Sequence, residues 1–107
     1  MVARLIERTP KPGRTSAIVS ILEYEVLPLL QKQHGFIDAI RVTDDAHPNC
    51  LITLTVWETR DDAEKFYASP EAKSRMERIM PLVDSVAIRT CSVETSTFHK
   101  VSGVVAT

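Results

Sequence analysis

The segment 50–58 (CLITLTVWE) constrains the fold most, because it predicts a β-strand that is apolar on both faces. Alternation divides its side chains into an aliphatic face, Ile52, Leu54 and Val56, and a mixed face, Leu51, Thr53, Thr55 and Trp57. We expect the purely aliphatic face to pack against helices. The mixed face carries the chain's only tryptophan, so we expect it to be covered as well.

Three further strands are predicted around this segment. Residues 2–9 and 36–43 are typical of strands, and the polar stretch 44–49 joins the second strand to the third as a hairpin. Residues 85–98 predict a long last strand, which also carries apolar side chains on both faces. The two cysteines fall on the third and fourth strands.

Helical spacing runs from about Thr15 to Gln33, with Thr15 or Ser16 as the N-cap. Pro28 predicts a kink in this helix, because proline lacks a backbone donor and clashes with the preceding turn. Gly35 is placed to follow the helix end. Two short helices are predicted to begin after residues 59 and 69, where Thr and Ser precede acidic first turns.

The resulting order, β-α-β-β-α-β, predicts a ferredoxin-like α+β sandwich with a split β-α-β arrangement and a four-stranded antiparallel sheet. The first and third strands are expected to be central, and residues 1–107 form a single domain. Two coverings fit the second apolar face: a small-molecule pocket or a partner sheet. A homodimer that closes two sheets into a dimeric α/β barrel satisfies both.

Composition excludes several classes of function. The 13 basic and 14 acidic side chains give a net charge of −1, so no basic face is expected for nucleic acid or for a membrane surface. Charges at Arg4, Glu7 and Arg8 interrupt any signal peptide, and Cys50 and Cys91 form no CxxC motif, which favours a reduced, cytoplasmic setting without a disulfide. Neither glycine nor histidine spacing predicts a nucleotide, a metal or another cofactor.

Three short motifs resemble the antibiotic biosynthesis monooxygenase (ABM) domain family, over nearly the whole chain. They are Leu51–Glu58 with its Trp-Glu end and following helix start, the helix exit Gln33–Phe36, and Val86–Arg89. The resemblance implies a dimeric α/β barrel of ferredoxin-like subunits. It also implies, for some members, oxygenation of quinol- or anthrone-type aromatics without metal or flavin, whereas other members degrade haem.

Residue by residue, the resemblance transfers little. Trp57 matches the family's tryptophan at the end of the third strand, and Thr53 stands where the polyketide-oxidising members have an asparagine. Haem-degrading members use an asparagine on the first strand and an axial histidine after the tryptophan. Here the first strand has no asparagine and Met76 falls roughly where that histidine would be, so haem degradation is not expected.

A cofactor-independent oxygenase requires a dry cavity, an aromatic wall, and a donor or cation that stabilises developing negative charge. The substrate-pocket candidates are Trp57 as wall and donor, Thr53 and Thr55 as hydroxyls, and Arg89 as the cation. No general base lies among them. Each also has a structural explanation: Trp57 at a dimer interface, the threonines as strand formers, and Arg89 paired with Glu7 or Glu94.

Two functions therefore remain open. The first is a cofactor-independent monooxygenase acting on a small aromatic substrate beside Trp57. The second is a non-catalytic dimeric barrel that binds a small apolar ligand or serves as an assembly module.

Overall fold

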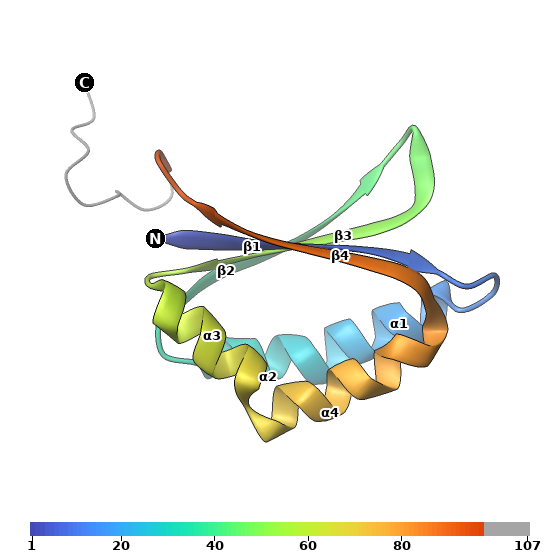
Figure 1. Ribbon diagram of the computed structural model, residues 1–107, viewed down its shortest axis with the longest axis horizontal. Helices are drawn as coiled ribbons and strands as arrows, with labels where there is room; N and C mark the ends of the chain where they lie inside the picture. Colours follow the sequence, from blue (N-terminus) through green and yellow to red (C-terminus); the bar gives the residue numbers. More distant parts are fainter. Residues whose placement is uncertain (98–107) are drawn as a thin grey trace.

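Among the residues that the structure describes, helices cover one face of the sheet and not the other, and the β2–β3 hairpin projects away from them (Figure 1). The computed structural model describes residues 1–97. Its elements are β1 Val2–Pro10, α1 Thr15–Ile21, η1 Leu22–Val26, α2 Leu27–Gln31, β2 Phe36–Asp44, β3 His47–Trp57, α3 Arg60–Ala68, α4 Pro70–Ile79, η2 Met80–Leu82 and β4 Val83–Ser92. The sheet is antiparallel in the order β2-β3-β1-β4, which confirms the ferredoxin-like α+β fold with β1 and β3 central.

The first helical segment accommodates its proline with a π-turn. The Leu27 N–H donates to the carbonyl of Leu22, five residues back, and Pro28 follows immediately. This wider turn absorbs the missing donor and the clash that proline brings to an α-helix. The N-cap is Arg14 rather than Thr15 or Ser16, because a turn at Gly13 (φ +77°) starts the helix one residue early.

The next two helices begin as predicted. The Thr59 hydroxyl accepts a hydrogen bond from the Asp62 N–H at 3.1 Å, and the Ser69 hydroxyl accepts from the Ala72 N–H at 3.3 Å. Such caps satisfy donors that the first helical turn leaves unpaired. Among the helices of residues 1–97, none combines the length and apolar character needed to cross a membrane.

The strand register overturns the expected orientation of the sheet. Trp57 is fully buried and Thr55 is 1% exposed on the face that packs against the helices, which we call the helix face. The aliphatic side chains of β3 lie on the opposite face, the open face, where they are half-buried: Ile52, Leu54 and Val56. The prediction was wrong because the indole finds aromatic partners on α3, and burying large rings outweighs burying small aliphatic groups.

The last strand is shorter than predicted. It begins at Val83 and ends at Ser92, and residue 98 lies outside the described residues. Cys50 and Cys91 lie on the two strands that flank β1, and both are free thiols, as expected.

Gly35 links the first helical segment to β2 in a conformation that other residues adopt poorly. Its φ is +79°, and a Cβ there would overlap the Asp62 carboxyl group. We expect Gly35→Ala to lower the free energy of unfolding by about 1–3 kcal/mol, measured by urea denaturation.

Gly13→Ala is the matched control, because Gly13 has a similar φ of +77° with nothing within 4 Å of a Cβ. Gly13→Ala should lower the free energy of unfolding only by the cost of holding alanine at a positive φ. Equal losses in the two variants would contradict the role given to Asp62.

Candidate functional site

The four predicted pocket residues do not converge on one place. Trp57, Thr55 and Thr53 share the helix face, whereas Arg89 lies on the open face and donates to Glu7 at 2.9 Å. The sheet itself therefore separates Arg89 from Trp57. The ion pair with Glu7 is the structural alternative expected for this arginine.

Trp57 is the centre of an aromatic cluster. Its ring centroid lies 5.6 Å from that of Phe36, 5.6 Å from that of Phe66 and 6.3 Å from that of Tyr67. The indole N–H donates to the Thr55 hydroxyl at 3.0 Å. Because that donor is used and the ring is fully buried, Trp57 supports its neighbours rather than offering a free polar group.

Tyr67 carries this network outward. Its hydroxyl lies 3.0 Å from the Thr55 hydroxyl, and either atom can be the donor. Since Thr55 already accepts from Trp57, it can donate to Tyr67 and leave the phenolic hydrogen free for another acceptor. Burial raises the pKa of Tyr67, against the opposing effects of Thr55, Arg4 and Arg8, so the phenol stays protonated at neutral pH.

Tyr67 borders a cavity of about 160 Å³ between β1, β4 and α4, which we call the arginine cavity. Two of its apolar lining residues, Met80 and Ile88, are more than half exposed and form a mouth to solvent. The lining residues are Arg4, Ile6, Arg8, Tyr67, Met76, Ile79, Met80, Val86 and Ile88.

The two arginines of this cavity have few partners. Arg8 is 3% exposed, its Nη2 donates to the Met76 sulfur at 3.4 Å, and its buried Nη1 has no hydrogen-bond partner among the described residues. The Arg4 guanidinium lies 4.2 Å from the centroid of the Tyr67 ring, a cation–π contact, and its buried Nε is also without a partner there. Within residues 1–97, neither arginine belongs to an ion pair.

The charge of Arg8 is therefore compensated poorly. Burial lowers the pKa of its guanidinium from the ordinary value, while the neighbouring Tyr67 acts in the opposite direction. An arginine nevertheless remains protonated in proteins. The arginine cavity thus combines a positive charge, a phenolic donor and apolar walls.

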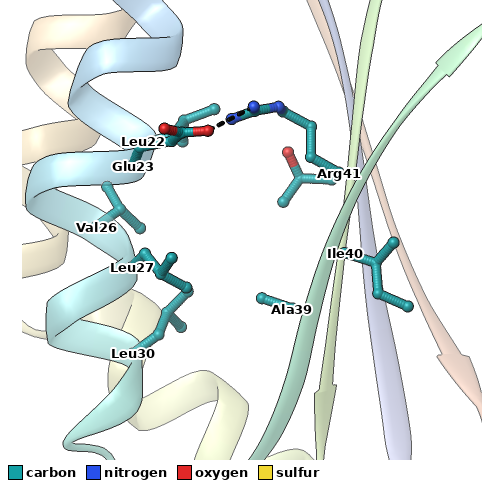
Figure 2. Close-up of a pocket in the computed structure, with 9 residues that line it drawn as sticks. Leu22, Glu23, Val26, Leu27, Leu30, Ala39, Ile40 and Arg41 are labelled. Atoms are coloured by element: carbon teal, nitrogen blue, oxygen red, sulfur yellow. Dashed lines mark hydrogen bonds and ion pairs between the residues drawn. The ribbon is translucent and has the colours of Figure 1, made fainter.

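A second cavity of about 300 Å³ lies between η1, α2 and β2 (Figure 2). Figure 2 shows helical side chains, among them Leu22, Val26 and Leu30, facing β2 across it. Its charges are paired, because the Arg41 guanidinium donates to the Glu23 carboxylate at 2.6 Å. Thr53 borders this second cavity, and its buried hydroxyl has no partner among the described residues.

Sequence reasoning missed Arg4, Arg8 and Tyr67. The sequence did contain a signal for the arginines. Arg4, Ile6 and Arg8 lie two positions apart on a strand predicted to be central, so their side chains share one covered face, on which Ile6 is buried. Tyr67 gave no such signal, because its place depends on how α3 packs against β3.

A sheet covered on one face by helices, with cavities between the two layers, defines a ferredoxin-like α+β domain. A sequence profile described as antibiotic biosynthesis monooxygenase matches residues 1–78. The chain therefore belongs to this family.

Solved structures share the fold at low sequence identity. Rv0793 from Mycobacterium tuberculosis is 16% identical with a TM-score of 0.79, covering 90% of this chain and 97% of that one. SnoaB, a cofactor-independent oxygenase from Streptomyces nogalater, is 14% identical with a TM-score of 0.78, covering 90% and 95%. A conserved protein from Methanosarcina mazei is 17% identical with a TM-score of 0.74, covering 84% and 90%. No curated protein sequence matches the chain significantly.

Proposed function

We propose that this protein is a cofactor-independent monooxygenase that oxidises a small aromatic, quinol- or anthrone-like substrate in the arginine cavity. Membership of the family and the fold shared with SnoaB support this activity. The observation that carries the proposal is a cavity that joins a solvent-facing mouth to a protonated phenol and an unpaired buried cation. Trp57 acts here as a positioning residue, through Thr55 and Tyr67.

The residues of the cavity suit a reaction in which the substrate supplies all the electrons. The substrate hydroxyl loses its proton to solvent at the mouth, since the charges of Arg4 and Arg8 favour the anion. The anion gives one electron to O2, and the two radicals combine in a C–O bond at a ring carbon that bears hydrogen. The peroxide takes up a proton, the ring hydrogen leaves as a proton, and the O–O bond breaks. One oxygen atom remains as a carbonyl and the other leaves as water.

Tyr67 is the proton donor to the peroxide in this scheme, because its hydroxyl stays protonated. We expect Tyr67→Phe to lower the rate of oxygen uptake roughly 100-fold, as the loss of one preorganised donor does in other enzymes. An oxygen electrode, with single-ring hydroquinones and anthrone as substrates, measures this rate.

Tyr24→Phe removes a hydroxyl from an exposed tyrosine and serves as the matched control. Wild-type rates in Tyr67→Phe would overturn the role of Tyr67. No oxygen uptake by the unchanged protein with any phenolic substrate would overturn the proposed activity.

A second function is favoured by the apolar cavity of Figure 2, whose charges are already paired. A non-catalytic domain would hold a small apolar ligand there, under η1 and α2. Binding of apolar ligands without oxygen uptake, weakened by Val26→Trp but not by Tyr67→Phe, would support this alternative. Val26 lines that cavity and not the arginine cavity.

We also propose that two copies pair through their open faces. Ile40 and Val42 of β2 are 45% and 46% exposed on the same face as the half-buried Leu54. A contiguous apolar surface of this kind is typical of protein interfaces. A twofold homodimer would cover it with the same surface of the second copy.

A further inference from the structure

We infer that the arginine cavity recognises an oxyanion carried on an apolar ring: a carboxylate or a phenolate. This inference rests on the cavity of the proposed function and names its ligand class. It concerns binding alone, so it is tested without oxygen.

The charge of Arg8 is the first argument. Burying a cation is costly unless a partner compensates it. Arg8 lies on the central strand β1 between Leu51 and Val86, and only 3% of the residue is exposed, so its guanidinium does not reach bulk water. Its Nη1 has no hydrogen-bond partner among residues 1–97, and Arg8 is one of the residues that line the cavity. A negatively charged group that enters the cavity is the partner this geometry lacks.

Two neighbouring donors point to an oxyanion in particular. The Arg4 guanidinium covers the Tyr67 ring at 4.2 Å, and both arginines act electrostatically on that phenol. A guanidinium presents donors in a planar fork that matches the two oxygens of a carboxylate. The phenolic hydrogen of Tyr67 adds a third donor from another element. Oxygen anions accept several such bonds at once.

The size and walls of the cavity set the rest of the ligand. Its volume of about 160 Å³ is close to the roughly 150 Å³ of an apolar cavity known to hold benzene. The remaining walls are apolar side chains of α4, η2 and β4, which suit a ring: Ile79, Met80, Val86 and Ile88. This space therefore holds a single-ring quinol, or one ring of an anthrone-like substrate.

Anaerobic calorimetric titration with benzoate and benzamide tests the inference, because the two probes share shape and differ in charge. We expect benzoate to bind at least about 10-fold more tightly than benzamide, as hydrogen bonds to charged groups imply. Inorganic sulfate should bind more weakly than benzoate, because it lacks the apolar ring. Equal affinities for benzoate and benzamide would overturn the inference.

Arg8→Met should abolish the preference for benzoate, and Arg8→Lys should retain part of it. Arg60→Met is the matched control, because it removes one positive charge from the exposed start of α3. A preference that survives in Arg8→Met, or one that disappears in Arg60→Met, would contradict the assignment to this cavity.

A second readout separates lost binding from lost folding. Arg8→Met replaces an uncompensated buried cation with an apolar side chain of similar length, so without ligand it should melt a few degrees higher than the unchanged protein. A lower Tm would overturn the claim that Arg8 is held without a partner.

The binding inference and the proposed reaction can fail separately. Benzoate selectivity without oxygen uptake from any phenol would leave this inference standing and overturn the proposed reaction. Oxygen uptake without a preference for benzoate would support the reaction and overturn this inference.

Discussion

A protein that carries Leu54→Arg is expected to elute as a monomer at concentrations where the unchanged chain elutes as a dimer. Leu54 lies at the middle of the open face, opposite Leu5 on β1 and Ile40 on β2. In a twofold dimer the new arginine of each copy would be buried in the interface without a partner. A penalty of about 4 kcal/mol, within the range for an unpaired buried charge, weakens association roughly 1,000-fold.

Leu27→Arg is the matched control, because it makes the same exchange at a 37% exposed leucine on α2, away from the open face. It should leave the elution position unchanged in size-exclusion chromatography with light scattering. A dimeric Leu54→Arg protein would show that the copies pair elsewhere. A monomeric unchanged chain would overturn the dimer.

The dimer and the arginine cavity concern opposite faces of one sheet. The side chains of β1 alternate between these two faces: Arg4 and Arg8 line the cavity on the helix face, while Leu5 and Glu7 lie on the open face. A dimer formed through the open faces would leave the mouth of the cavity at β4 and η2 on the helix side. We therefore expect Leu54→Arg to lose dimer formation while it keeps benzoate binding, and Arg8→Met to lose the preference for benzoate while it remains a dimer.

The elements of the fold could be predicted because their signals are local. Thr59 and Ser69 cap the helices that follow them within three residues, and the polar stretch 44–49 ends one strand and begins the next. The strand order followed from the β-α-β-β-α-β sequence of elements, since few topologies satisfy the handedness rule. None of these inferences needed a contact between distant residues.

The orientation of the sheet could not be predicted, because alternation defines two faces without saying which one meets the helices. The outcome depends on rings brought together from β2, β3 and α3: Phe36, Trp57, Phe66 and Tyr67. The cluster extends from residue 36 to residue 67, and its longest contact in sequence joins Phe36 to Trp57, 21 positions apart. An aliphatic triplet was a weaker guide than a single large ring with aromatic partners.

The candidate site differed for a related reason. The only tryptophan is the most distinctive residue of the sequence, so the sequence analysis placed the site beside it. In the structure its N–H donates to the Thr55 hydroxyl, and the polar residues that line the arginine cavity are Tyr67, Arg4 and Arg8. That Arg8 lacks an acidic partner becomes clear only from the folded structure, in which no described Asp or Glu forms an ion pair with it. Sequence reveals charges, whereas compensation is a property of the folded chain.

Trp57→Ala is expected to cause the largest loss of stability among the single substitutions considered for this chain. The residue is fully buried and touches three aromatic rings, so its removal opens a large cavity in the core. Truncation of a buried tryptophan costs about 3–5 kcal/mol, a large share of the roughly 5–15 kcal/mol that stabilise a domain. Thr55 also loses the hydrogen bond from the indole.

Urea denaturation followed by far-UV circular dichroism measures this loss without relying on tryptophan fluorescence. Trp57→Phe should cost less than Trp57→Ala, because a ring still fills most of the space while the bond to Thr55 is lost. Tyr24→Ala, at a tyrosine that is 76% exposed, is the control and should change stability by no more than about 0.5 kcal/mol. If Trp57→Ala costs as little as the control, Trp57 does not organise this core, and the support it lends to Tyr67 through Thr55 fails with it.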